Sequence, residues 1–535
     1  MTPTLAPPLP ARPRPETPAG AAHSRRWAVL AVLALTVFIT VVDGTIVNVA
    51  LPSLARDLSA TTRQLQWIVD AYLVVFAGLL LAAGGLGDRY GRKPMLVAGL
   101  VVFGATSALA GSMGSAGTLI GARALMGIGA AMVFPTTLAI LTNVFSDPRE
   151  RAAAIGIWSG VSGLAVATGP IAGGWLLEHF WWGSVFFVNV PVVILAIAAT
   201  VAIVPNSSDA EAPPLDRAGL VLSIAAIISL VFTIIEAPEW GWLTPATGAG
   251  FTLAAALLAT FVWWERRTAQ PMLPVRIFAN RRFSAASGAV TAAFFALFGF
   301  VFLVTQYFQL VRGYDPLEAG LRTLPVALAI ATASVVAPFV VRALGTTKVV
   351  ATGLALMAAA FAWISTGSAV TPYTEIVGQM LVLGMGLGFT TAPATESIMG
   401  SLSADKAGVG SAVNDTTREL GGTLGVAVLG SVFNSIYVGA LAAGPVVSQL
   451  PEAARAATEE SVGAAAAVAP GLGAQAPAYV AEVSQAFLDG FAAASLVAAG
   501  VAAVAAVLVA LALPSRATGE QAARPGGGPA SSRVA

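Results

Sequence analysis

The hydrophobic residues of this 535-residue chain gather in long apolar stretches, which short polar segments separate. A helix needs about 20 mostly apolar residues to cross the roughly 30 Å hydrocarbon core of a bilayer. Stretches near that length occur at 27–51, 65–86, 94–113, 117–141, 152–176, 184–204, 216–236, 246–264, 283–310, 320–341, 347–366, 374–397, 407–434 and 484–513. We therefore predict an all-α polytopic membrane protein with fourteen transmembrane helices, numbered here as spans 1 to 14.

The composition agrees with this pattern and excludes several kinds of chemistry. Hydrophobic residues make up 57% of the chain and charged residues only 10%, whereas about a quarter of a soluble domain is charged. The chain has no cysteine, which excludes disulfides, thiol catalysis and cysteine metal sites. Its two histidines, His23 and His179, do not provide a metal or triad site. We expect no catalytic residues, no metal and no enzyme activity.

The distribution of basic residues predicts how the chain is oriented in the membrane. With a cytoplasmic N-terminus, most of the 28 Lys and Arg residues fall in cytoplasmic segments, as the positive-inside rule requires. Both termini are then cytoplasmic, in disordered tails at 1–26 and 514–535. The apolar run after Arg26 continues without a cleavage site, which indicates a retained first span rather than a signal peptide. The Ala-rich segment 435–483 is extracytoplasmic in this arrangement, and we expect part of it to be helical.

An internal repeat indicates how the spans are grouped. A shift of about 254 residues places Gly91 on Gly345 and Gly99 on Gly353, and a slightly larger shift places the segment 127–129 on 384–386. Two parallel six-helix halves, 27–204 and 281–513, would produce this repeat, with two extra helices and a cytoplasmic loop at 205–280. Chance glycine matches in a glycine-rich chain are the alternative.

The segment between spans 2 and 3, GGLGDRYGRK at 84–93, is too charged to lie in hydrocarbon. We predict a tight turn in water, in which Gly91 permits the bend. Its basic residues also fit a simple positive-inside anchor. The candidate residues of this loop are Gly84, Asp88, Arg89, Gly91, Arg92 and Lys93.

This loop resembles the loop signature of the major facilitator superfamily of transporters, and four further segments resemble its fourteen-helix drug:proton antiporter family. They are DGTIVNVALP at 43–52, GARALMG at 121–127, GPIAGG at 169–174 and GVGSAVND at 408–415, the last followed by Gly421 and Gly422. The second-half copy of the loop is degraded, because Arg342 replaces the acid. The resemblance implies the major facilitator fold, and it implies that the loop locks the two halves in one access state.

Charged residues inside the spans are the candidates for proton coupling, because each costs about 2.5–3.5 kcal/mol to insert. Asp43, Asp70 and Arg123 lie at similar predicted depths in spans 1, 2 and 4. An arginine flanked by two carboxylates can hold one ionised while the other exchanges a proton. The family resemblance also implicates this arginine in coupling. A buried ion pair that only fixes helix packing is the alternative.

The second half carries its own group of intramembrane charges. Asp415, Arg418 and Glu419 are spaced to share one face of span 13, so Arg418 could neutralise one acid and leave the other to bind a proton or a cation. We take Asp415 as a proton-coupling candidate and Glu419 and Glu396 as further candidate acids. Glu396 lies near a span end, where it can reach water.

Span 5 carries the segment that the resemblance associates with exporters. Gly169 and Pro170 interrupt the helical hydrogen bonding, and Gly173 and Gly174 permit close helix contact. This face either seals a gate or only packs tightly.

Together these features predict a proton-coupled secondary exporter of amphipathic small molecules, such as hydrophobic or cationic drugs and antibiotics, in the cell membrane. No phosphate-binding loop is present, so we expect the proton gradient to drive transport without a cofactor. We also expect a monomer with no nucleic-acid partner. A proton-coupled importer, and a membrane sensor or scaffold without a transport cycle, are the alternatives.

Overall fold

The computed structural model describes residues 19–145, 147–208, 216–401 and 407–514. Within these ranges, fourteen helices are long and apolar enough to cross a membrane, as predicted. The predicted tails therefore lie mostly outside the described residues. The elements are α1 (Ala19–Asp57), α2 (Thr62–Tyr90), α3 (Arg92–Gly111), α4 (Ala116–Val144), α5 (Pro148–His179), α6 (Ser184–Phe187), α7 (Asn189–Ile203), α8 (Arg217–Trp240), α9 (Pro245–Arg267), η1 (Val275–Ala279), α10 (Arg281–Gln306), η2 (Tyr307–Val311), α11 (Pro316–Arg322), α12 (Leu324–Leu344), α13 (Thr346–Ile364), α14 (Tyr373–Met399), α15 (Ala407–Ala442), η4 (Val447–Gln449), α16 (Glu452–Glu460), α17 (Val462–Val468), η5 (Ala469–Gln475) and α18 (Ala476–Ala512).

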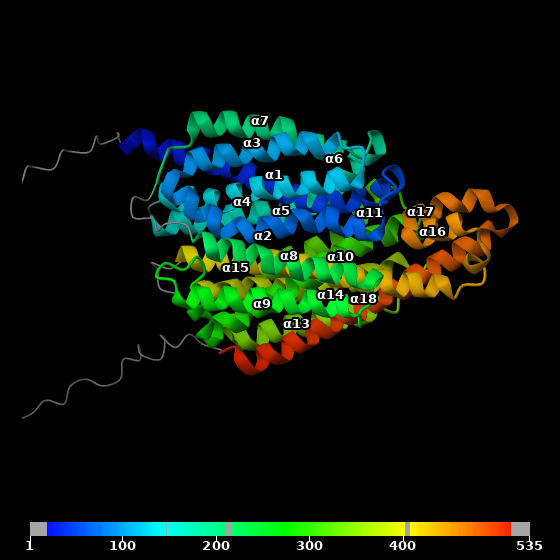
Figure 1. Cartoon of the computed structure of the whole chain (residues 1–535). Helices are drawn as coiled ribbons and strands as arrows, with labels where there is room; N and C mark the ends of the chain where they lie inside the picture. The colour runs from blue at the N-terminus through cyan, green and yellow to red at the C-terminus, as the bar shows by residue number, and fades with distance from the viewer. Residues whose placement is uncertain (1–18, 146, 209–215, 402–406, 515–535) are drawn as a thin grey trace, which may run out of the picture.

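The long helices run roughly along one common direction (Figure 1). Helices α1 to α7 pack chiefly against one another, and so do α10 and α12 to α15 with α18. Helix α11 packs chiefly against α5 but leads directly into α12, so we count it with the latter set. We call these the first and second groups. Helices α8 and α9 pack on each other, and α8 also contacts α2 and α15, one helix from each group. The residue boundaries that we predicted for the two halves stay a prediction.

The two ends of the bundle differ (Figure 1). The described chain ends lie at one end, which we call the tail end. The opposite end, which we call the loop end, carries α16 and α17. The tail end is the end that the charge distribution predicts to be cytoplasmic.

The two groups make equivalent contacts at the repeat positions. Gly91 and Gly345 each precede a helix with positive φ, +108° and +85°, which is the conformation that favours glycine. A Cβ on Gly99 would lie 3.0 Å from the carbonyl oxygen of Gly129, and a Cβ on Gly353 would lie 2.7 Å from that of Gly386. These glycines therefore let α3 approach α4, and α13 approach α14, in the same way in both groups.

The charged segment at 84–93 differs from the predicted loop. Helix α2 continues to Tyr90 and α3 begins at Arg92, so only Gly91 lies between the two helices. Asp88 and Arg89 thus belong to the last turn of a helix. The prediction of a tight bend at Gly91 is correct, but a charged helix end can project beyond the hydrocarbon without unwinding.

The predicted extracytoplasmic segment 435–483 is shorter than expected and, as expected, partly helical. Helix α15 continues to Ala442, and α18 already begins at Ala476. The short helices α16 and α17 lie between them, and a Cβ on Gly463 would lie 2.5 Å from the Cβ of Ala55 at the end of α1. Alanine favours helix whether or not lipid surrounds it, so these helices extend past the apolar stretch that marks the membrane.

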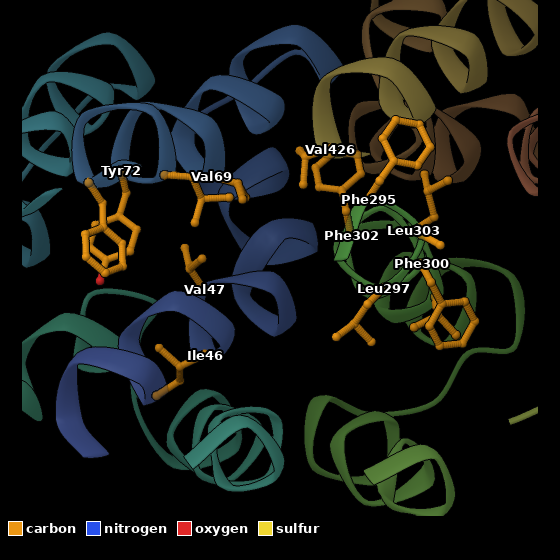
Figure 2. Packing of buried hydrophobic residues seen from close by; sticks show 14 of the residues in the cluster. Ile46, Val47, Val69, Tyr72, Phe295, Leu297, Phe300, Phe302, Leu303 and Val426 are labelled. Atoms are coloured by element: carbon orange, nitrogen blue, oxygen red, sulfur yellow. The ribbon is translucent and has the colours of Figure 1, made fainter. Parts of the chain in front are cut away.

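A continuous cluster of buried apolar side chains joins both groups of helices. Figure 2 shows part of it, with Val47 and Val69 on helices of the first group and Leu297 and Phe302 on α10 of the second. The candidate polar residues are embedded in this apolar interior.

Candidate functional site

Arg123 lies at the centre of a polar network inside the first group. Its side chain is fully buried, and its guanidinium lies 4.3 Å from the ring centre of Tyr72. Nη1 donates to Oδ2 of Asp43 at 2.6 Å, and Nε donates to the carbonyl oxygen of Ile68 at 3.0 Å. Arg123 of α4 therefore connects α1 and α2 through one ion pair and one backbone hydrogen bond.

Asn189 completes the surroundings of Asp43. Its Nδ2 donates to Oδ1 of Asp43 at 2.8 Å and to Oγ of Ser107 at 2.9 Å. The Ser107 hydroxyl donates in turn to the carbonyl oxygen of Phe186. Both oxygens of Asp43 are thus engaged, one by an arginine and one by an amide. Asn189 and Ser107 were not predicted from the sequence, although a polar amide inside a span was a signal that could have identified Asn189.

Asp70 lies in a different environment. Its side chain is fully buried, and neither carboxyl oxygen has a hydrogen-bond partner among the described residues. The expectation that Arg123 is flanked by two carboxylates is therefore wrong, because the guanidinium pairs with Asp43 alone. The carbonyl oxygen of Ile68 accepts from Nε of Arg123, and the remaining Nη2 of Arg123 is buried without a partner among the described residues.

The charged residues of α15 do not pair with one another. Within the described part of the chain, Arg418 has no carboxylate within 4.0 Å, and its Nη2 donates to Oγ1 of Thr395 at 3.1 Å. Asn414 donates to Asp415 through a long 3.4 Å contact, and Oε2 of Glu419 is buried without a partner. The side chain of Arg418 turns toward α14 and forms no ion pair with either acid, so the neutralisation of one acid by Arg418 stays a prediction.

Glu396, the remaining candidate acid, lies in the last turn of α14 with an exposed side chain. Its neighbour Thr395 bonds Asn414 and Arg418 of α15, but no hydrogen bond or ion pair of the Glu396 side chain itself is described. Its position agrees with a side chain that reaches water at the tail end.

The residues of the charged segment at 84–93 hold helix ends together at the tail end. Arg92 pairs with Asp88 at 2.7 Å across Gly91, and Lys93 donates to the carbonyl oxygen of Val201 at 2.7 Å. The side chain of Arg89 lies over the ring of Tyr90, and Gly84 lies next to Pro135 of α4. All of these contacts lie within the first group, so the predicted locking role stays a prediction.

The glycines of α5 contact both groups. A Cβ on Gly169 or Gly173 would collide with Thr45 or Ile46 of α1. A Cβ on Gly174 would lie 2.4 Å from the carbonyl oxygen of Pro316 in α11. Facing it, a Cβ on Gly320 would lie 2.3 Å from the carbonyl oxygen of Pro170. Helices α5 and α11 therefore meet backbone to backbone across the boundary between the groups.

Hydrogen bonds close the same boundary at the loop end. Gln66 of α2 donates to the carbonyl oxygens of Val426 and Ala427 and to the hydroxyl of Ser431, all in α15. Thr305 donates to the carbonyl oxygen of Asn48, and Gln309 donates to that of Val49. The hydrogen bonds described between the two groups thus lie toward the loop end.

Comparisons with known proteins agree on one family. The sequence model of the Major Facilitator Superfamily matches residues 33–426. The multidrug efflux pump LfrA of Mycolicibacterium smegmatis is 36% identical over 490 residues, which cover 91% of this chain and 96% of that protein. The methyl viologen resistance protein SmvA of Salmonella typhimurium is 35% identical, over 77% of this chain and 83% of that protein. The tetracenomycin C resistance and export protein of Streptomyces glaucescens is 35% identical, over 78% of each.

Solved structures show the same fold. A bacterial homologue of the human lysosomal transporter Spinster superposes with a TM-score of 0.66, covering 92% of this chain and 99% of that one at 17% identity. A D-xylose–proton symporter superposes with a TM-score of 0.57 at 13% identity, covering 91% of this chain and 98% of that one.

Proposed function

The chain belongs to the major facilitator superfamily, and we propose that it is a proton-coupled exporter of amphipathic small molecules such as drugs or antibiotics. Members of this superfamily are multi-pass membrane transporters rather than enzymes. Three relatives that match over most of their length are named for efflux, resistance or export. These names support export as the direction of transport.

The environment of Asp70 carries the proposal of proton coupling. An ionised carboxylate buried without a partner is costly in a membrane interior, whereas its neutral form is far less so. Asp43 is held by Arg123 and Asn189, so it can stay ionised while Asp70 gains and loses a proton. Asp43 would thus keep Arg123 neutralised, and Asp70 would exchange the proton, although the two carboxylates do not share the arginine.

The contacts at the loop end would have to form and break as the transporter changes the side to which it is open. With the loop end closed by Gln66, Thr305 and the α5–α11 contact, a molecule bound between the two groups would have access only from the tail end. Release of a proton from Asp70, followed by separation of these contacts, would expose the bound molecule to the opposite side. Asp415 and Glu419 lie on α15 in the second group, so their surroundings would change in the same movement.

The proton gradient would provide the energy, with no cofactor. Each charge that crosses 100 mV of membrane potential contributes about 2.3 kcal/mol, so entry of protons can drive exit of a drug against its concentration gradient.

Inside-out vesicles containing the full chain would test the proposal. With an acidic lumen, addition of cationic dyes or neutral aromatic antibiotics to the outside should release lumenal protons as the compound accumulates. Asp70→Asn should abolish this release. Glu239→Gln is the matched control, because Glu239 is an exposed acid of α8 that contacts Arg63. Movement of compound and protons in the same direction would instead indicate an importer.

A further inference from the structure

Helix α9 is the least enclosed of the fourteen spans. Only 17% of its most apolar window is buried, and it packs chiefly against α8. A shallow groove of about 560 Å³, open to the outside, runs along its outer face. Its lining residues all belong to α9: Ala255, Leu258, Ala259, Val262, Trp263, Arg266 and Arg267. The residues with small side chains, Ala255 and Ala259, lie one turn apart and form its floor.

The length and polarity of this groove match one leaflet of a bilayer. From Ala255 to Arg266 the helix rises about 16 Å at 1.5 Å per residue, which is about half of a 30 Å hydrocarbon core. The far end of the groove is aliphatic. Trp263 and the two arginines occupy the end where headgroups lie, at the tail end of the bundle.

The two arginines at the head of the groove carry charges that no nearby acid neutralises. Among the described residues, neither Arg266 nor Arg267 forms an ion pair. Glu265 is the adjacent acid, but it is buried and its Oε2 accepts from the backbone N–H of Leu273. The guanidinium of Arg267 lies 4.5 Å from the ring centre of Trp263, which holds it over the groove.

We propose that this groove is a binding site for an anionic phospholipid, with an acyl chain along the aliphatic part and the phosphate between Arg266 and Arg267. The aliphatic face alone would accept any lipid or a second copy of the chain. Two unpaired guanidinium groups at headgroup depth favour a negatively charged headgroup.

Native mass spectrometry of the purified full chain with added phosphatidylglycerol or phosphatidylcholine would test the site. We expect phosphatidylglycerol to bind more tightly, and Arg266→Gln/Arg267→Gln to weaken that binding roughly 25-fold, since each arginine near an anionic lipid contributes about fivefold. The matched control is Arg217→Gln/Arg276→Gln, which removes the same charge from exposed residues outside the groove. Phosphatidylglycerol binding should persist in this control.

A second variant distinguishes the contribution of the groove to lipid binding from that of the charge. Ala255→Leu/Ala259→Leu fills the floor and keeps both arginines, and it should also weaken phosphatidylglycerol binding. The proposal would be overturned if the two double arginine variants lost phosphatidylglycerol binding equally. It would also be overturned if the parent protein bound phosphatidylglycerol and phosphatidylcholine equally well. A two-chain species that disappears in the alanine variant would show that the groove is an interface between copies instead. None of these results depends on transport activity.

Discussion

Asp43 and Asp70 are buried carboxyl groups in the same group of helices, yet they differ in what surrounds them. Asp43 is bonded by Arg123 and Asn189, and Asp70 by no described residue. A substitution that removes the charge should therefore have opposite consequences for stability at the two positions.

We predict that Asp43→Asn lowers the thermal stability of the purified protein and that Asp70→Asn leaves it unchanged or raises it. Removal of one partner from a buried ion pair leaves the guanidinium of Arg123 uncompensated, which costs about 3–5 kcal/mol. The change at Asp70 breaks no described bond. Thermal unfolding followed by tryptophan fluorescence in detergent would measure both variants. A similar loss of stability at both positions would mean that Asp70 also has a bonding role.

The sequence identified the charged residues of the site but not their pairing. Asp43, Asp70 and Arg123 were recognisable because charges are rare inside apolar stretches. Which acid pairs with the arginine depends on side-chain directions that spacing along a helix does not determine. Arg418 shows the same limit, since it shares a helix with Asp415 and Glu419 but donates to Thr395 of the neighbouring helix.

At the scale of the elements, α5 contributes different faces to the two groups. Gly169 and Gly173 lie against α1 of its own group, while Gly174 lies against α11 of the other. The contact of Gly174 with α11, together with that of Pro170 with Gly320, must separate if the groups move apart at the loop end.

We predict that Gly174→Ala weakens closure at the loop end. Its Cβ would lie 2.4 Å from a backbone oxygen of α11, and such overpacking costs about 1–3 kcal/mol. The chain has no cysteine, so a single Val49→Cys can report access. Labelling by a membrane-impermeant maleimide from the loop side should rise. Gly160→Ala is the control in the same helix, because nothing lies within 4 Å of its Cβ position. Unchanged labelling in Gly174→Ala would show that α11 yields without opening the boundary.

The sequence predicted the number of membrane helices correctly because hydrocarbon demands a long apolar run from every one of them. It did not predict how far α2, α15 and α18 extend beyond the membrane. Hydrophobicity marks only the part of a helix that lies in lipid. The rest is stabilised by helix propensity and by contacts such as the hydrogen bonds of Tyr437 in α15 and Tyr479 in α18 with Thr458 of α16.

At the scale of the whole molecule, Gln66 connects three parts of the bundle. It donates from α2 to Ser431 of α15, and the Ser431 hydroxyl donates to the carbonyl oxygen of Ile234 in α8. The extra helix pair is thus bonded at the same point at which the two groups meet. A Cβ on Gly430 would lie 2.4 Å from Nε2 of Gln66, so the amide fits here because α15 has glycine at that position.

Replacement of Gln66 by leucine should therefore shift the whole molecule toward opening at the loop end. The carbonyl acceptors in α15 keep their helical hydrogen bonds, so the change removes mainly the connection between groups. The loss of about 1 kcal/mol would change the equilibrium between closed and open states roughly fivefold. Labelling of Val49→Cys from the loop side should accelerate by a similar factor. Gln485→Leu, at an exposed glutamine on α18, should leave the rate unchanged. If both leucine variants label at the parent rate, Gln66 only fills space between α2 and α15, and the other contacts between the two groups keep the loop end closed.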